Sequence, residues 1–311
     1  MAIKKAVYFF CIDDLKDEAA PRILQKVVEA FDLEETDIEV DGYKVLKYVD
    51  ASSNEFYMAK TNRVICQDYK EYIPVINEHF EDFDIAAMVN WHGGQNAPDK
   101  VLCVHTVGDV ASATYCPSNP VPSTNLARAL ENHRKRLNLE DFRVTTEATH
   151  WSGIVYDGNS EWLAESEVPF LDIEIGSTSE SYNNPIAAKV IAHALMDAFS
   201  SEARVPTVLY MGGIHFEDTI TNAVLHPTHP VSLTHILPSR WLENDMYMGE
   251  NGRDYLMKCI DSIEGSIDGI VIHEKLKREI KDHAEVIAEV LSRPVIKRKA
   301  LKSVEATGLY K

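Results

Sequence analysis

The chain has 311 residues, a net charge of −18 at neutral pH, and apolar side chains at 45% of its positions. A chain of this length buries a large core without disulfide bonds, and its acidity excludes a protein that coats nucleic acid over its whole surface. It still allows one end of a nucleic acid to bind at a local basic patch. Five scattered cysteines without a CxxC pair, no signal peptide and no apolar run of ~20 residues predict a cytoplasmic protein with reduced thiols and no membrane contact.

Hydrophobic runs and periodicity predict strands that alternate with helices along the chain. In chain order, we expect a strand at residues 4–12, a helix at 17–31, short strands at 43–49, 56–60 and 63–67, a strand pair at 84–94 and 100–109, a helix at 123–138, strands at 143–150 and 168–177, a helix at 184–199, a strand at 206–213, and helices at 254–263 and 273–291. Ser123 or Thr124 is expected to cap the helix at 123–138, and Pro185 to lie in the first turn of the helix at 184–199.

No internal repeat, low-complexity segment or clear linker divides the sequence. We therefore expect a single α/β domain over residues 1–311, with insertions. Alternation of strands and helices predicts a mixed, mostly parallel sheet that helices cover on both faces.

Ionisable side chains recur where the apolar strands finish. They are His92, His105, Glu147 with His150, Asp172 with Glu174, and His215, with His235 as a further candidate. A single histidine in a strand is more often a hydrogen-bonded core residue, but five strand ends of one design favour a functional site. Imidazoles and carboxylates gathered at one sheet edge suit zinc binding or general acid–base chemistry.

The local spacing sets conditions on how these groups can meet. Asp172 and Glu174 are two residues apart on a strand and share a face. Glu147 and His150 would point to opposite faces of an extended strand, so they converge only if the chain turns near Thr149. His226 and His229 lie between prolines and suggest a loop more than a metal site. No phosphate-binding glycine loop and no GxSxG elbow is present.

Six motifs in this order resemble the archaeal and plant D-aminoacyl-tRNA deacylases of the second type. They are "VNWHGG", "VHTVGD", "EATHWSG", "FLDIEIGS", "MGGIHF" and "THILP", spread over about residues 85 to 240. The chain departs from the family pattern at Trp151, where the family has a second histidine, and at Phe216, where it has tyrosine. Arg240 keeps the positive charge of the family's basic segment, shifted by one place.

The resemblance implies a phosphorylase/hydrolase-like α/β fold and a metal-dependent hydrolase that uses one or two zinc ions. The implied reaction releases D-amino acids from the 3′ end of tRNA. The implied catalytic residues are Glu147, His150 and Glu174. The implied zinc ligands come from His92, His105, His150 and His215. The implied substrate-binding residues are Thr149, Trp151, Gly176, Ser177, Gly213 and Arg240.

Several points stay open at this stage. Either Glu147 or Glu174 could be the general base, and the other a ligand. The Trp151 indole could narrow the pocket or stack on the terminal adenine. Basic clusters at 134–136 and 297–299, together with Arg240, are the candidates for gripping tRNA. The alternative functions are a zinc amidohydrolase or peptidase, a nucleoside phosphorylase-like enzyme, and a non-catalytic protein that binds the aminoacyl end of tRNA.

Overall fold

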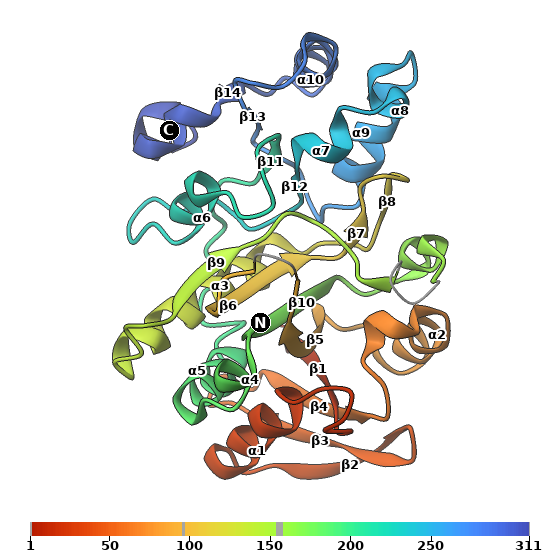
Figure 1. Ribbon diagram of the computed structural model, residues 1–311, viewed down its shortest axis with the longest axis vertical. Helices are drawn as coiled ribbons and strands as arrows, with labels where there is room; N and C mark the ends of the chain where they lie inside the picture. Colours follow the sequence, from red (N-terminus) through yellow and green to blue (C-terminus); the bar gives the residue numbers. More distant parts are fainter. Residues whose placement is uncertain (1, 95–96, 154–157, 311) are drawn as a thin grey trace.

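A computed structural model describes residues 2–94, 97–153 and 158–310. Its largest element is an eight-stranded sheet in the order β2-β3-β4-β1-β5-β10-β6-β9 (Figure 1). The strands are β1 (Lys5–Cys11), β2 (Glu34–Val40), β3 (Tyr43–Val49), β4 (Glu55–Thr61), β5 (Ile85–His92), β6 (Lys100–Thr106), β9 (Arg143–Thr146) and β10 (Phe170–Ser177). The central strands β4, β1, β5 and β10 are parallel, whereas β6 and β9 run parallel to each other and antiparallel to β10.

Helices cover both faces of this sheet, as the alternating pattern predicts. On one face α1 (Ala20–Ala30), α3 (Pro120–Arg136) and α5 (Pro185–Leu195) pack on the main hydrophobic core. On the other face α2 (Tyr69–Phe80) and the 3₁₀ segment η3 (Ser160–Glu165) cover a second core. Strand β1 is buried along nearly its whole length because both faces are covered, which explains its continuous apolar run.

A smaller parallel sheet in the order β12-β11-β13-β14 lies beside the large one (Figure 1). Its strands are β11 (Val208–Met211), β12 (Ile236–Leu237), β13 (Gly269–Ile272) and β14 (Val295–Lys297). Around it lie α6 (Asp218–Val224), α7 (Ser239–Leu242), α8 (Asp245–Met248), α9 (Gly252–Asp261), α10 (Arg278–Val290) and η4 (Arg298–Thr307). Tyr210 and Val271 of this sheet belong to the same core cluster as Tyr8 and Val89, so the main core continues from one sheet to the other.

The remaining elements are short. They are η1 (Ile65–Gln67), α4 (Ser179–Tyr182), and the two-stranded ribbon of β7 (Gly108–Asp109) and β8 (Thr114–Tyr115). All five cysteines are buried and unpaired. Across the residues that the structure describes, no helix has both the length and the apolar character needed to span a membrane.

The sheet and most of its strands confirm the mixed, mostly parallel α/β prediction, but several local predictions are wrong. The strand predicted at residues 63–67 is wrong: Ile65–Gln67 form the 3₁₀ turn η1, because the short apolar run leads straight into α2. The strands at 84–94 and 100–109 are not a pair, since β10 lies between β5 and β6. The predicted strand at 143–150 ends at Thr146, and the helix predicted from residue 273 begins at Arg278. The sequence pattern does not predict β2, α2 and β13.

The two helix starts show why caps are harder to assign than helices. Pro185 does lie in the first turn of α5, where the Asn184 side chain accepts hydrogen bonds from the Ile186 and Ala187 amides. The predicted cap of α3 is wrong: the Asn119 side chain accepts from the Val121 amide. Ser123 lies inside the helix, where its hydroxyl donates back to a carbonyl one turn earlier, and so does its neighbour Thr124.

Candidate active site

A stripe of polar side chains crosses one face of the large sheet at β5, β10 and β6. The register pairs Glu174 with Asn90 on one side and with Cys103 on the other. Asp172 is likewise paired with His105 on β6. Directly paired residues project from the same face of a sheet, so these groups form one continuous surface.

This arrangement corrects the expectation of a site along one sheet edge. Because β6 runs antiparallel to β10, the carboxyl end of β6 lies opposite the beginning of β10. His105 therefore faces Asp172 early in β10, whereas His92 is paired with Gly176 near its end. The groups meet across the middle of the sheet because the strands run in opposite directions.

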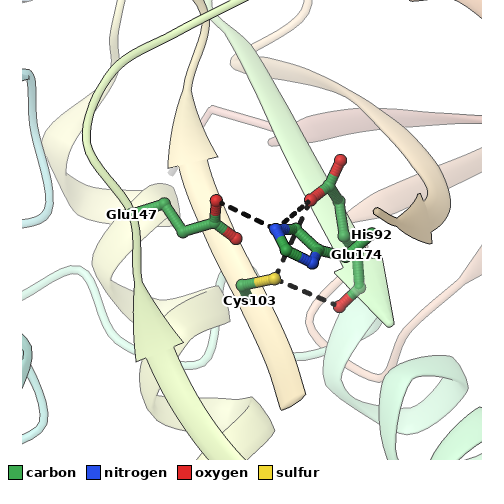
Figure 2. Close-up of side chains that lie close together, drawn as sticks. All are labelled: His92, Cys103, Glu147 and Glu174. Atoms are coloured by element: carbon green, nitrogen blue, oxygen red, sulfur yellow. Dashed lines mark hydrogen bonds and ion pairs between the residues drawn. The ribbon is translucent and has the colours of Figure 1, made fainter. Parts of the chain in front are cut away.

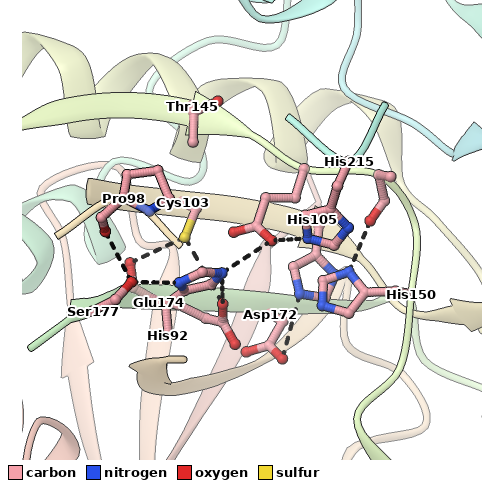
Figure 3. A network of polar contacts seen from close by, with 12 residues as sticks. His92, Pro98, Cys103, His105, Thr145, His150, Asp172, Glu174, Ser177 and His215 are labelled. Atoms are coloured by element: carbon pink, nitrogen blue, oxygen red, sulfur yellow. Dashed lines mark hydrogen bonds and ion pairs between the residues drawn. The ribbon is translucent and has the colours of Figure 1, made fainter. Parts of the chain in front are cut away.

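The segment after β9 supplies the next part of the site. The Glu147 amide still donates to the Val104 carbonyl, and beyond it the Ala148 amide donates to the His215 carbonyl. The Glu147 carboxylate lies over the stripe, with Oε2 2.8 Å from His215 Nε2 and 3.5 Å from His92 Nε2 (Figures 2 and 3). A single carboxylate thus links the imidazole at the end of β5 to one in the segment that follows β11.

The imidazoles themselves are close together. The His105 and His150 rings stack with centroids 3.8 Å apart, and the His150 ring centroid lies 4.7 Å from that of His215 (Figure 3). His92 Nε2 lies 4.0 Å from Glu174 Oε2, which completes the connection to β10. The structure therefore brings Glu147, His150, Glu174 and His215 to one place, although the sequence separates them widely.

Exposure differs sharply within the group. The Glu147 side chain is 0% exposed and the His92 side chain 6%, whereas that of His215 is 38% exposed. His215 consequently stands between the buried carboxylate and solvent.

Backbone carbonyls fix the tautomers of two imidazoles. His105 Nδ1 lies 3.0 Å from the Thr106 carbonyl oxygen, and His150 Nδ1 lies 2.8 Å from that of Ala148. A carbonyl can only accept, so Nδ1 carries the proton in both rings and Nε2 is left with a lone pair. His105 Nε2 is buried and has no hydrogen-bond partner among the described residues.

A hydroxyl fixes the third imidazole in the same way. The Ser177 hydroxyl donates to the Pro98 carbonyl at 2.9 Å, so it can only accept from His92 Nδ1, 2.8 Å away. The neutral His92 ring therefore turns a lone pair at Nε2 toward Glu147 and Glu174. A lone pair facing carboxylate oxygens is unfavourable unless a proton or a cation lies between them.

Burial shapes the electrostatics of the site. It raises the pKa values of Asp172 and Glu174 well above their usual range, and the nearby carboxylates add to this effect. It lowers the pKa of His105 and brings that of His150 to about 4. For Glu147 burial acts in the same upward direction, but the neighbouring imidazoles of His215 and His92 hold its pKa well below the usual value.

Three overlapping groups of side chains have ligand atoms within 4.8 Å of one another. They are His92, Cys103, Glu147 and Glu174; His105, Glu147 and His150; and His105, Asp172 and Glu174. Imidazole nitrogen, thiolate sulfur and carboxylate oxygen are the donors that zinc prefers. Three of the four predicted ligands are in these groups, while His215 contacts Glu147 instead.

Sequence reasoning missed Cys103 and Asn90 at this site. The sequence shows Cys103 only as a scattered thiol, although it precedes His105 by two residues on one strand and so shares its face. Its sulfur lies 3.8 Å from Glu174 Oε2. Asn90 precedes His92 by the same spacing, and its side-chain amide donates to Asp172.

The predicted substrate-binding residues lie in different surroundings. Trp151 lines a pocket of about 220 Å³ next to His150. Ser177 orients His92, as described above. Thr149 is 0% exposed, and its hydroxyl lies between the Thr106 hydroxyl, 2.8 Å away, and His235 Nδ1, 3.3 Å away. We therefore assign Thr149 and His235 to a structural network.

The two predicted glycines each accommodate a neighbouring side chain. A Cβ atom at Gly176 would lie 2.7 Å from His92 Cβ. Gly213 has a φ of +83°, and a Cβ there would lie 2.5 Å from a Glu217 carboxylate oxygen. Both positions need glycine for the packing of the protein itself. That they also bind substrate, as the resemblance implies, stays a prediction.

Some of the basic residues predicted to bind tRNA are engaged in ion pairs, and others are exposed. Arg134 and Lys135 both pair with Glu131 on α3. Arg298 pairs with two carboxylates, those of Glu217 and Glu274. Among the other candidates, the exposed positions are Arg136, Arg240, Lys297 and Lys299. The Arg240 guanidinium lies 5.5 Å from the centre of the neighbouring Trp241 ring.

Taken together, the mixed α/β fold and the buried imidazole–carboxylate site define a hydrolytic enzyme. The family model for D-aminoacyl-tRNA deacylase matches residues 79–296. The chain belongs to the D-aminoacyl-tRNA deacylase family.

Relatives along nearly the whole chain agree with this family. A D-aminoacyl-tRNA deacylase of Archaeoglobus fulgidus is 28% identical over 92% of this chain and 95% of its own length. One from Pyrococcus abyssi is 25% identical over 90% of this chain and 96% of its own. The crystal structure of a conserved protein of unknown function is similar with a TM-score of 0.74 and 25% identity, over 97% of this chain and 98% of that one.

Proposed function

We propose that this protein is a metal-assisted hydrolase that cleaves the ester between a D-amino acid and the 3′ end of tRNA. The family supports the substrate class. The observation that carries the chemistry is the set of imidazole Nε2 atoms turned toward buried carboxylates, with His105 Nε2 and Glu147 Oε1 left without partners among the described residues. Buried polar atoms without partners are rare, and a bound ion, a bound water or a catalytic role commonly accounts for them.

The residues present fit zinc. One ion would be held by His92, Cys103 and Glu174, and a second by His105 and His150, which leaves the Glu147 carboxylate beside both groups for proton transfer. Neither set needs a ligand at position 151, so the tryptophan there does not remove the metal chemistry. When bound, zinc would polarise the ester carbonyl and acidify water.

The residues of the chain supply the proton transfers. Glu147 is placed to accept a proton from the water whose oxygen attacks the ester carbon. The carbon–oxygen bond to the ribose then breaks, and the 3′ oxygen needs a proton. His215, 2.8 Å from Glu147 and partly open to solvent, is placed to relay the proton from Glu147 to that oxygen. The products are a free D-amino acid and tRNA with its 3′ hydroxyl restored.

Because the protein is acidic, we propose that tRNA binds only where exposed basic residues are present. Arg240, Lys297 and Lys299 are exposed, whereas Arg134, Lys135 and Arg298 are engaged in ion pairs. We propose that the exposed group contacts phosphates. Because such contacts release counterions, tRNA affinity should fall steeply as salt rises.

The decisive experiment measures the release of D- and L-amino acids from charged tRNA by the purified protein, before and after chelation and after zinc is restored. We expect release of D-amino acids, loss of activity on chelation, and recovery with zinc. Full activity after verified metal removal would overturn the metal-assisted mechanism. Turnover of small amides without turnover of charged tRNA would favour an amidohydrolase instead.

A further inference from the structure

A pocket of about 220 Å³ lies beside the candidate active site and is not used by the proposed chemistry. It is lined by Trp151, which directly follows His150, and by Trp162 of η3 and Tyr69 at the start of α2. The Tyr69 and Trp151 ring centroids lie 6.2 Å apart, and the ring planes are inclined at 44°. Three aromatic side chains from three segments thus meet at this pocket.

The loop backbone holds Trp151 in place. A Cβ atom at Gly153 would come within 2.3 Å of the six-membered ring of the indole, and one at Gly158 within 3.2 Å. Both glycines therefore allow the backbone to pack closely against the ring. This packing restricts the orientation of the Trp151 indole at the pocket. Trp162 is half-buried, and its packing on the second core restricts the orientation of its indole as well.

The pocket adjoins the candidate active site. Trp151 of its lining directly follows His150, whose ring stacks on that of His105 in the candidate active site. A ligand in the pocket would therefore lie close to the site at which we propose that the ester reacts.

Charge and size narrow the class of ligand. Among the described residues that line the pocket, only Asp68 and Lys70 are charged, and Asp68 is paired with Arg63. The exposed Lys70 therefore gives the pocket edge a local positive charge in a protein of net charge −18. The volume is below the ~300–1,000 Å³ of pockets that enclose drug-sized ligands, so it suits one planar ring system.

The polar lining suits a nucleobase edge. Gln67 and Asn159 each carry an amide group that can both donate and accept hydrogen bonds. Aromatic walls with a cation at the rim are how proteins hold the end of a single-stranded nucleic acid.

We infer that this pocket binds the terminal base of the tRNA 3′ end, with the indoles of Trp151 and Trp162 against the base and Lys70 near the preceding phosphate. The inference rests on the proposed function, because it takes the substrate to be a charged tRNA. The base and the ester are joined through one ribose, which agrees with a base pocket directly next to His150.

Binding of uncharged tRNA tests the pocket without any chemistry. The affinities of intact tRNA and of the same tRNA lacking its terminal adenosine are compared for the wild type and for Trp162→Ala, Trp162→Phe and Lys70→Ala. Removal of the adenosine should weaken wild-type binding by about 5- to 150-fold, the range for loss of one stacked base. Trp162→Ala should bind both tRNAs with similar affinity, and Trp162→Phe should keep most of the preference.

Two controls make the result specific. Lys189→Ala removes an exposed lysine from α5 and should leave binding unchanged, whereas Lys70→Ala should weaken binding of both tRNAs. Thermal unfolding of each variant shows whether weaker binding reflects a loss of structure. The phenylalanine variant remains informative if the alanine variant does not fold.

The possible outcomes separate the two proposals. If the wild type binds both tRNAs equally, or if folded Trp162→Ala keeps the full preference, the inference is wrong. If Trp162→Ala keeps that preference but changes the order of turnover among different D-amino acids, the pocket holds the acyl side chain instead. Adenosine-dependent binding without any deacylation would reject the proposed function and leave the base pocket standing.

Discussion

Two buried polar networks lie side by side in this protein, and they differ in one respect. Around Thr149, the Thr106 hydroxyl and the two ring nitrogens of His235 all find partners, with Ser262 binding Nε2 at 3.0 Å. Around Glu147, only two residues before Thr149, His105 Nε2 and Glu147 Oε1 have none among the described residues.

The difference shows how a structural network can be told from a functional one. Both contain histidine, and both join the large sheet to the small one. A satisfied network stabilises the fold and cannot accept a ligand without losing hydrogen bonds. An unsatisfied one costs stability until a ligand, a metal or a reacting group completes it.

The largest expected effect is the replacement of the carboxylate at the centre of the unsatisfied network. Glu147→Gln keeps the shape but removes the charge that joins His92 and His215. We expect kcat on D-aminoacyl-tRNA to fall by about 10³-fold, within the ~10²–10⁴ range for a lost acid–base group. Single-turnover release of labelled amino acid measures it, with Glu289→Gln on the exposed side of α10 as the matched control. Retention of wild-type turnover would remove Glu147 from the mechanism.

The second largest effect is expected at His150, in the segment that follows β9. His150→Ala should reduce turnover by at least ~100-fold, because it removes a lone pair that the Ala148 carbonyl holds in position. Zinc content, measured on the same preparation, should fall as well. A variant that keeps both its activity and its metal would place His150 with the structural network.

A third prediction tests the satisfied network directly. Thr149→Val keeps the side-chain volume but leaves the Ile236 amide, now 2.9 Å from the hydroxyl, without that partner. We expect the free energy of unfolding to fall by ~1–3 kcal/mol, the cost of an unsatisfied buried group. Urea denaturation measures this decrease. The folded variant should retain kcat, and a large fall in kcat at unchanged stability would show that Thr149 serves the reaction.

The smallest effect should come from the protein surface. Lys297→Glu with Lys299→Glu should weaken tRNA binding, because both side chains are exposed. The slope of log affinity against log salt should become shallower by roughly 0.7–0.9 for each phosphate that the protein no longer neutralises. Turnover of a small D-amino acid ester should not change. Equal decreases on tRNA and on the small ester would mean that this segment supports folding and does not bind tRNA.

Trp151 is the position beside His150 at which the chain departs from the family pattern. Replacement with histidine, the residue of the family pattern, should be tolerated in folding and should alter substrate affinity or preference more than the chemical step. Comparison of KM and kcat for D-aminoacyl-tRNA separates the two effects. A rise in kcat by orders of magnitude would mean that the tryptophan disables an otherwise complete site.

The sequence by itself determined the kind of fold and most of the strands that carry chemistry. Buried parallel strands have long apolar runs because both faces are covered, so β1, β5 and β10 could be read directly. The polar residues that interrupt these runs, such as His92 and Glu174, are visible for the same reason: a buried run tolerates them only at a cost.

Only the tertiary structure decided which of those residues meet and which atoms stay unpaired. The antiparallel course of β6 places Cys103 opposite Glu174, and no local pattern encodes the order of strands in a sheet. The turn after Thr146 likewise separates Thr149, which is buried and satisfied, from His150, which faces the site. Hydrogen-bond partners are set by segments far apart in the chain, so a linear sequence shows the polar groups but not whether they are satisfied.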